Sequence, residues 1–221
     1  MSTLTCAPVA PLIDRLFDEA ARASPLDVPA VASLTAGERN RLMRSKTDYL
    51  DFYGHLKDMP LAVSRETGML LYMLVRHSRA RSVVEFGTSF GISTLYIAAA
   101  LRDNGGGHVI TCEFEPSKVQ RARRHLTEAG LIDLVEIREG DALHTLRSDL
   151  PALVDVLLLD GAKALYADVL DLVEANLRPG ALVVADNAEY NPEYLDRVRS
   201  AGGGYLSVPF ADDVELSLRL Y

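Results

Sequence analysis

The sequence predicts an α/β fold: a doubly wound, mostly parallel seven-stranded sheet with an antiparallel C-terminal hairpin and an N-terminal helical cap. From about residue 80 onward, short apolar runs alternate with segments of helical periodicity. Two of these runs, residues 154–159 and 181–185, are almost wholly apolar, as is typical of strands buried on both faces of a parallel sheet. The last two β-rich runs follow one another with only a short turn between them, which breaks the alternation.

The first 80 residues indicate helices. Thr35 and Glu38 have the spacing of a capping box ahead of a long polar helix that we expect to run to about Leu56. Ser64 is expected to cap another helix that ends near His77. The N-terminal helices either cap the edge of the sheet or simply pack against it, and the sequence leaves both arrangements open.

The strands expected after residue 80 are separated by clear helix and turn signals. They are residues 81–86, 108–113, 134–138, 154–159 and 181–186, with the hairpin at 205–210 and 214–220. Pro116 and Gly130 bound one helix, since proline suits the first turn of a helix and glycine its C-terminal end. Residues 178–180, Arg-Pro-Gly, end the next long helix, and the polar residues 211–213 form the hairpin turn.

The composition argues against several classes of function. A formal net charge of −8 disfavours nucleic acid as a partner, because phosphate binding usually needs a basic face. No apolar stretch approaches the ~20 residues of a membrane-spanning helix, and residues 1–11 lack the pattern of a signal peptide. The only cysteines, Cys6 and Cys112, give no disulfide framework. We therefore expect a cytoplasmic protein with no membrane partner.

Polar side chains follow both of the most apolar strands. Asp160 and Lys163 come directly after the first strand, and Asp186 and Asn187 come at the end of the second. In open α/β sheets, ligands bind at the edge formed by the carboxyl ends of the strands. Three oxygen donors suit a hard divalent cation such as magnesium, and Lys163 could take a proton. Each residue alone is more often a cap, a turn former or a surface charge, so the prediction depends on their joint placement.

A glycine-containing loop follows the first strand. Gly87 and Gly91 stand where the strand hands over to a helix, where a backbone can approach a ligand closely. Their G-x-x-x-G spacing differs from the dinucleotide fingerprint and disfavours a nicotinamide or flavin cofactor. Glu113 ends the second strand, where a carboxylate can accept hydrogen bonds from ribose hydroxyls. Loop and acid together suit a nucleoside-containing cofactor without a pyrophosphate, and a plain tight turn is the alternative for the loop alone.

These motifs resemble a known family. From about Ala62 onward they occur in the order found in class I S-adenosylmethionine-dependent O-methyltransferases of the cation-dependent catechol and caffeoyl-CoA O-methyltransferase family. The resemblance implies a single Rossmann-like methyltransferase domain over residues 1–221, with residues 1–60 as the N-terminal helical cap and residues 61–221 as the cofactor-binding and catalytic core. It implies S-adenosylmethionine and Mg²⁺, or another divalent cation, as cofactors. It also implies a small catechol-like aromatic acceptor and a homodimer.

The resemblance assigns roles to individual residues. The cofactor-binding residues that it implies are Val63, Glu85, Gly87, Thr88, Ser93, Glu113, Asp141, Ala142 and Asp160. Within this set, residues 62–64 are similar to the segment that closes over the methionine carboxylate, and residues 139–142 to the adenine-side loop. Asp160, Asp186 and Asn187 match the metal ligands. Lys163 and Asp160 match the catalytic residues, with Lys163 as a base if burial and a nearby cation lower its pKa.

This chain departs from the family pattern at two places. Many relatives read Asp-Ala-Asp-Lys where residues 160–163 of this chain read Asp-Gly-Ala-Lys. The caffeoyl-CoA enzymes have Trp-Asn-Gly where this chain has Tyr-Asn-Pro at 190–192, which leaves Asn191 as a substrate contact. Tyr49, Phe52 and Tyr53 could line an acceptor pocket, although helix packing is the favoured interpretation.

The leading hypothesis is therefore metal-dependent methyl transfer from S-adenosylmethionine to a hydroxyl of a small catechol-like aromatic acceptor. The alternative within the family is a methyltransferase that acts on a non-catechol small molecule, with the metal site weak or unused. A nicotinamide oxidoreductase is disfavoured by the glycine spacing. A non-catalytic cofactor-binding or scaffold protein is disfavoured by the joint presence of Asp160, Lys163, Asp186 and Asn187.

Overall fold

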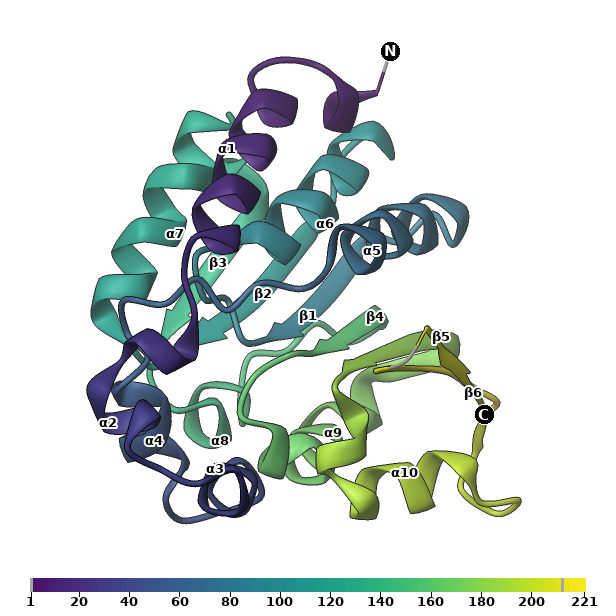
Figure 1. Cartoon of the computed structure of the whole chain (residues 1–221). Helices are drawn as coiled ribbons and strands as arrows, with labels where there is room; N and C mark the ends of the chain where they lie inside the picture. Colours follow the sequence, from purple (N-terminus) through teal and green to yellow (C-terminus); the bar gives the residue numbers. More distant parts are fainter. Residues whose placement is uncertain (1, 212) are drawn as a thin grey trace.

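The computed structural model describes residues 2–211 and 213–221. Seven strands form one sheet in the order β3-β2-β1-β4-β5-β7-β6 (Figure 1). Their bounds are β1 Ser82–Phe86, β2 His108–Glu113, β3 Val135–Glu139, β4 Val154–Leu159, β5 Leu177–Asp186, β6 Tyr205–Phe210 and β7 Val214–Arg219. The first five are parallel, whereas β7 runs antiparallel to both β5 and β6. The predicted mostly parallel sheet with an antiparallel hairpin is confirmed; Asp212 of the predicted turn lies outside the described residues.

Helices cover both faces of the sheet (Figure 1). Those of at least one full turn are α1 Val9–Ala21, α2 Pro29–Ala32, α3 Ala36–Met43, α4 Tyr49–Gly54, α5 Arg65–His77, α6 Ile92–Asp103, α7 Pro116–Glu128, α8 Ala142–Thr145, α9 Tyr166–Val173 and α10 Pro192–Arg199. One core cluster joins α1, α5, α6 and α7 to one face of the central strands, and a second joins α8, α9 and α10 to the other. Among the described residues, no helix combines the length and the apolar composition needed to cross a bilayer.

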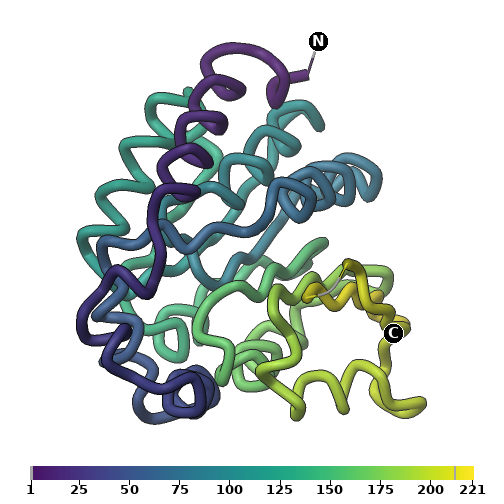
Figure 2. The backbone as a smooth tube through the Cα atoms, viewed as in Figure 1, coloured from purple at the N-terminus to yellow at the C-terminus, as the bar shows by residue number. Residues whose placement is uncertain are grey.

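The N-terminal helices show both of the arrangements expected from the sequence, packing on the sheet and forming a separate cap. Leu12 and Leu16 of α1 are buried in the same cluster as α6, so this helix packs on the sheet. Helices α2 to α4 instead form a small cluster of their own around Val31, Phe52 and Leu56. Figure 2 shows the chain passing from α1 along one side of the molecule to this group. We call residues 24–61 the cap.

Two predicted boundaries are wrong. The long helix expected after Thr35 is two helices, although its capping box is present. The Ser45 hydroxyl bonds the Asp48 carboxylate at 2.8 Å and accepts the backbone N–H of Asp48 at 3.1 Å, and such local bonds compete with helix formation. Strand β5 begins at Leu177 rather than near 181, because residues 178–181 bulge between the pairs Val154–Leu177 and Val156–Leu182.

The ends of β1 and β4 approach each other closely at Gly87. This glycine has φ +104°, and a Cβ built on it would lie 2.6 Å from the Asp160 carbonyl oxygen. The Asp160 N–H donates to the Phe86 carbonyl at 2.8 Å, which fixes the approach. Only glycine tolerates both the backbone angle and the contact. The glycine loop and the Asp160 loop are therefore held side by side.

Candidate active site

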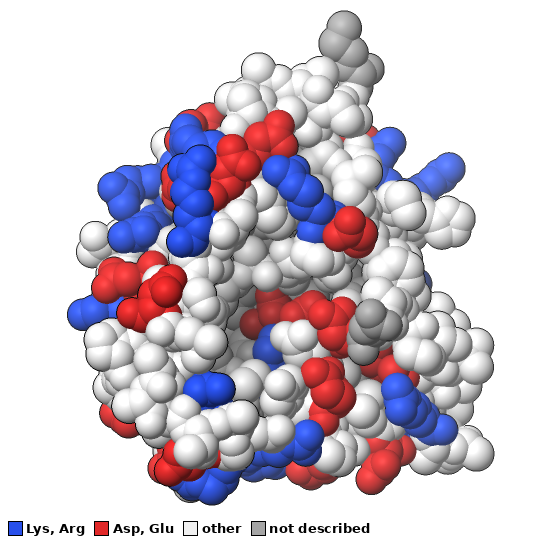
Figure 3. Space-filling view, viewed as in Figure 1, with Lys and Arg blue, Asp and Glu red and all other residues white. Residues whose placement is uncertain are grey.

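A cavity of about 730 Å³ lies where the carboxyl ends of the parallel strands meet the cap. The strand ends contribute Gly87, Glu113, Asp141, Ala142, Asp160, Lys163, Asp186 and Asn187 to its wall. The cap contributes mainly apolar and aromatic side chains, among them Val31, Tyr49, Phe52 and Tyr53. Figure 3 shows a hollow near the centre of one face, with acidic side chains gathered along its wall and basic side chains beside them. One cavity thus brings together the glycine loop and the predicted metal and catalytic residues.

Lys163 lies between the two predicted metal-binding carboxylates. Its Nζ donates to Asp160 Oδ1 at 2.8 Å and lies 3.6 Å from Asp186 Oδ2. All three side chains are largely buried. Burial disfavours the charged amine, but the charge of Asp160, helped by Tyr166 and Asp186, outweighs it and raises the pKa of Lys163 well above its ordinary value. Burial alone therefore does not make Lys163 a base; a further positive charge beside the carboxylates is needed.

The two carboxylates hold their protons unusually tightly. Burial, together with the neighbouring charge of Asp160, raises the pKa of Asp186 to about 7. Burial also raises the pKa of Asp160, although the ammonium of Lys163 opposes this. Two adjacent buried carboxylates favour a bound cation or proton, because neither solvent nor distance screens their repulsion.

Asn187 directly follows β5 and has a left-handed conformation, with φ 50° and ψ 45°. Asparagine tolerates this conformation better than most residues, and it turns the side chain into the cavity wall beside Asp186. Its Nδ2 donates a hydrogen bond to Asp213 Oδ2 at 3.4 Å. This bond uses the amide nitrogen of Asn187 and not its amide oxygen. The Tyr166 hydroxyl donates to the Asp186 carbonyl at 2.6 Å and so anchors the end of β5 from below.

These residues have the donor chemistry of a divalent-cation site. Asp160, Asp186 and Asn187 offer two carboxylates and an amide oxygen around one cavity, and oxygen donors are what magnesium prefers. Among the described residues, no three His, Cys, Asp or Glu side chains form a metal-binding group. The predicted set has only two carboxylates, so it does not depend on such a group. The donor set fits a hard divalent cation, and metal binding stays a prediction.

Asn191 is buried beneath the Lys163 loop rather than in the cavity wall. Its Nδ2 donates to the carbonyl oxygens of Lys163 and Ala164, both at 2.9 Å. Its Oδ1 accepts the Tyr194 N–H at 2.8 Å and so caps α10. The resemblance suggested a substrate contact at this position, but the side chain contacts the protein itself. Asn191 holds the backbone from which Lys163 projects.

The cofactor end of the cavity is built around Glu113. Its carboxylate accepts the Ser89 N–H at 2.9 Å and the Glu115 N–H at 3.0 Å, which fixes it beside the glycine loop. Burial raises its pKa. Lys118 on α7 also lines the cavity and is only 4% exposed, and burial lowers its pKa against the opposing charge of Glu113. Lys118 carries no functional signal in the sequence, because it lies in the first turn of an ordinary helix.

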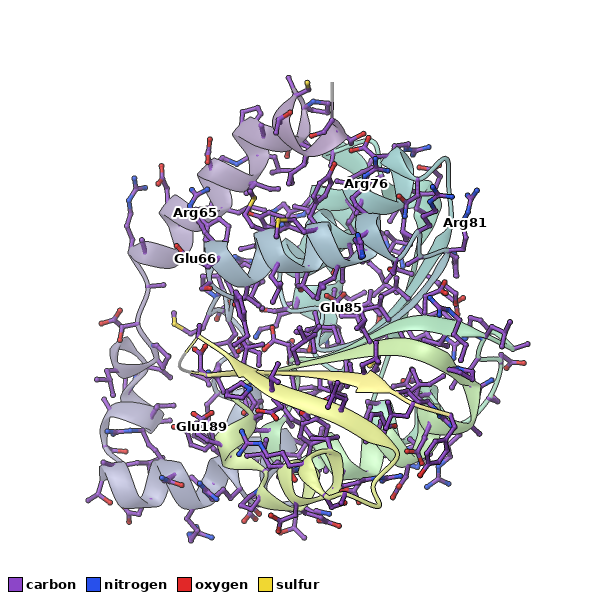
Figure 4. All side chains as sticks on the ribbon, turned by 90° about the vertical axis from the view of Figure 1, so that its right-hand side faces the viewer. Arg65, Glu66, Arg76, Arg81, Glu85 and Glu189 are labelled. Carbon is purple, nitrogen blue, oxygen red and sulfur yellow. The ribbon has the colours of Figure 1, made fainter. Side chains whose placement is uncertain are left out.

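Four of the predicted cofactor residues lie behind the cavity wall. Val63, Glu85, Thr88 and Ser93 are each buried and are not among the residues that line the cavity. Figure 4 shows Glu85 in the interior, far from the outward-pointing Arg76 and Arg81. Its carboxylate accepts the Ser93 hydroxyl at 2.6 Å and the Thr94 hydroxyl at 2.5 Å. Glu85 thus ties the end of β1 to the first turn of α6, and its role toward a cofactor stays a prediction.

The other predicted cofactor residues line the cavity, and one of them also holds the cap. Asp141 accepts the Leu143 N–H at 3.0 Å and so caps α8. Its second oxygen accepts the Tyr49 hydroxyl at 2.8 Å, across the junction between core and cap. Phe52 and Tyr53 pack in the cap cluster, and Tyr49 packs in the core cluster that contains α8 to α10. All three also line the cavity, so the two interpretations offered for them are compatible.

The chain matches methyltransferases in sequence. Residues 84–188 match the family described as "Methyltransferase domain". The chain is 34% identical over 143 residues to a catechol O-methyltransferase of Niastella koreensis, covering 62% of each chain. It is 34% identical over 127 residues to a catechol O-methyltransferase of Mycobacterium tuberculosis, covering 58% of this chain and 57% of that one. This chain is a relative of the class I S-adenosylmethionine-dependent O-methyltransferases of the catechol and caffeoyl-CoA type.

The likeness to a solved O-methyltransferase extends over the whole fold. The structure of TomG from Streptomyces achromogenes, in complex with S-adenosylmethionine, matches with a TM-score of 0.63 and 26% identity, covering 92% of this chain and 99% of that chain. The chain spans less than two thirds of the length of the two catechol O-methyltransferases, 62% and 57%. The recognition of the family from its motifs is confirmed, and so is the Rossmann-like methyltransferase fold.

Proposed function

We propose that this protein transfers a methyl group from S-adenosylmethionine to a hydroxyl of a small, catechol-like aromatic acceptor, and that a divalent cation, Mg²⁺ in the first instance, assists. One observation carries the proposal: a single cavity is lined by the glycine loop at one end and, beside it, by Asp160, Lys163, Asp186 and Asn187. The names of the relatives agree with methyl transfer to a hydroxyl.

Different residues of the chain would bind the methyl donor, hold the cation, hold the acceptor and accept the proton. Gly87, Glu113 and Ala142 would bind the donor, and Asp160, Asp186 and Asn187 would hold the cation. When bound, the donor supplies an electrophilic methyl group, and the cation supplies Lewis-acid stabilisation of an ionised hydroxyl. The apolar cap would hold the aromatic ring and exclude water. Lys163 would take the proton of the reacting hydroxyl at Nζ, and the position of that hydroxyl near the methyl carbon would supply much of the rate.

Turnover with a panel of acceptors tests the proposal. Purified protein with S-adenosylmethionine, Mg²⁺ and a panel of catechols should give methylated product, and a chelator should abolish it. Lys163→Met should lower kcat by about 10²- to 10⁴-fold. Lys57→Met, at an exposed position outside the cavity, is the control and should match wild type. Absence of product from every catechol would contradict the proposed acceptor class.

One observation favours a second candidate. Lys163 already lies between Asp160 and Asp186, so its ammonium competes with a cation for the same oxygens. A methyltransferase that acts on a non-catechol small molecule, with the metal site weak or unused, would keep this ion pair. Full activity in a chelator, on an acceptor with a single hydroxyl, would support this second candidate over the first.

We also infer a homodimer in the cytoplasm. The outer strand β6 exposes Leu206 and Val208, at 63% and 52%, and an exposed apolar edge strand favours pairing or burial. Both cysteines are free thiols, which suits a reducing compartment. The net charge of −8 supports a small molecule, rather than nucleic acid, as the partner in the active site.

A further inference from the structure

Tyr53 joins the cap to the catalytic end of the cavity. It lies on α4, and its ring meets the Phe52 ring edge-on at 5.2 Å between centroids. It packs both against the cap cluster and against the cluster beneath the sheet. Contacts on both sides fix the direction of the ring, so the position of the hydroxyl is set by the fold rather than by a flexible side chain.

The Tyr53 hydroxyl is buried and, within the part of the chain that the structure describes, has no hydrogen-bond partner. Tyr53, Asp160 and Lys163 line the same cavity. Burial raises the pKa of Tyr53, whereas the charge and the nearby backbone N–H of Lys163 lower it, which places the hydroxyl beside Lys163. A buried hydroxyl without a partner lowers stability, so its retention in a cavity wall points to a ligand that completes the bond.

Other polar side chains on the cap wall already have partners. They are Ser24, which accepts the Leu26 N–H; Arg39, which donates to the Leu34 carbonyl; Asn40, which accepts from Arg44; and Tyr49, which donates to Asp141. Tyr53 differs from them because, within the described part of the chain, its hydroxyl makes no hydrogen bond of ordinary geometry. Its surroundings also include Lys163, where the reacting hydroxyl is proposed to lie.

We propose that the Tyr53 hydroxyl recognises the acceptor by a hydrogen bond to the oxygen next to the hydroxyl that is methylated. The inference rests on the proposed function and names the feature that the site would select: two neighbouring oxygens on one aromatic ring. The tyrosine hydroxyl can donate a hydrogen bond to the second oxygen of the acceptor, whether that oxygen is protonated or ionised. It can also accept a hydrogen bond from that oxygen when the oxygen is a hydroxyl. Tyr53 is then a specificity-determining residue, and Lys163 remains the group that moves the proton.

The test compares Tyr53→Phe with wild type on two acceptors, a catechol and the matched phenol that lacks the second hydroxyl. Phenylalanine keeps the ring and removes only the oxygen. The KM for the catechol should rise about 3- to 10-fold with kcat little changed, because one hydrogen bond to the bound acceptor is lost. The KM for the phenol, or its inhibition constant if it is not methylated, should change less than about twofold, since that ligand has no oxygen to offer.

Tyr194→Phe is the matched control. The Tyr194 hydroxyl is also buried without a partner among the described residues, but Tyr194 does not line the cavity. Both variants should fold at least as stably as wild type, because each removes an unsatisfied hydroxyl, and both should bind S-adenosylhomocysteine as wild type does. Only Tyr53→Phe should change the preference between the two acceptors.

The outcomes separate this inference from the proposed function. A wild-type protein that methylates no catechol overturns the proposed function, and the inference with it. A wild-type protein that methylates catechol, with a Tyr53→Phe variant of unchanged KM, overturns the inference alone. An equal rise in KM for catechol and phenol also overturns it, because the hydroxyl would then serve packing rather than recognition of the second oxygen.

Discussion

Asp186 is the side chain whose protonation most affects the site. Its pKa, raised to about 7 by burial and by Asp160, lies above the ordinary value of an unfolded aspartate, ~3.9. The folded protein therefore binds the extra proton between these values, and the stability that this proton contributes is present at low pH and is lost as the pH rises through about 7.

We expect Asp186→Asn to gain stability over wild type as the pH increases. In a chelator, the difference in Tm between the variant and wild type should be larger at pH 8 than at pH 5, because only wild type must carry the buried charge at pH 8. Thermal unfolding at several pH values measures this. Asp51→Asn, at an exposed position on α4, is the control and should show no such trend. A difference that does not depend on pH would show that Asp186 titrates normally.

Asn191 offers a test of how Lys163 is positioned. Asn191→Ala removes both bonds to the Lys163 loop and the cap of α10, whereas Asn191→Asp keeps an acceptor for the Tyr194 N–H and loses only the donors. We expect both variants to lower kcat about 10- to 100-fold by moving Lys163, with S-adenosylhomocysteine affinity little changed. The alanine variant should also lose stability. Wild-type kcat in Asn191→Asp would mean that the hydrogen bonds from Asn191 to the Lys163 loop are not needed for catalysis.

One group of contacts attaches the cap to the core near Asn187. Arg44 at the end of α3 stacks over the Tyr190 ring at 5.5 Å and donates to the Glu189 carbonyl at 3.0 Å. Lys46 pairs with Asp168 at 2.7 Å and with Glu193 at 3.0 Å. These contacts join the cap to α9 and to the segment that follows Asn187, so they fix the distance between the acceptor wall and the predicted cation ligands.

Loosening this attachment should weaken the binding of the acceptor and leave the binding of the methyl donor unchanged. Arg44→Ala is expected to raise the KM for the acceptor about 2- to 5-fold, because the cap must be ordered when the acceptor binds, and to leave the affinity for S-adenosylhomocysteine unchanged. Arg41→Ala is the control: Arg41 lies on the same helix, is largely exposed and makes only a 3.7 Å contact with Asp48. Steady-state kinetics and calorimetric titration give the two quantities. A weakened donor affinity in Arg44→Ala would contradict this division.

The elements that the sequence predicted well are those with a local signal. The strand ends at Glu113, Leu159 and Asp186 were placed correctly because each apolar run stops at a polar residue. The break between α3 and α4 was missed because Ser45 and Asp48 stabilise a turn by side-chain bonds that residue spacing does not reveal. The bulge in β5 depends on pairing with Val154, which is distant in sequence.

The same division applies to the candidate site. Asp160, Lys163, Asp186 and Asn187 could be grouped from their positions at strand ends, and the structure brings them around one cavity. The inward burial of Lys118 and the unpartnered hydroxyl of Tyr53 could not be predicted, since each depends on how a helix rotates against the sheet or the cap. The contact of Asn191 with the Lys163 loop likewise required the tertiary structure.

The whole molecule has an exposed apolar edge that bears on its assembly. If Leu206 and Val208 lie in a homodimer interface, light scattering should give twice the chain mass of 24.2 kDa, and the double variant Leu206→Glu/Val208→Glu should give the monomer mass. The charges would be placed in an apolar interface without partners. Leu153→Glu, which alters another exposed leucine at 63%, is the control and should remain dimeric. A wild-type monomer would remove the dimer from the proposal.

The proposal as a whole depends on one cavity that holds a methyl donor beside a divalent cation. Anomalous diffraction from crystals grown with Mn²⁺ and S-adenosylhomocysteine would test this directly. We predict an ion coordinated by oxygens of Asp160, Asp186 and Asn187, with the Lys163 amine displaced from between the carboxylates and the nucleoside beside Glu113. An occupied nucleoside site with Lys163 still bridging Asp160 and Asp186, and no ion between them, would contradict the account.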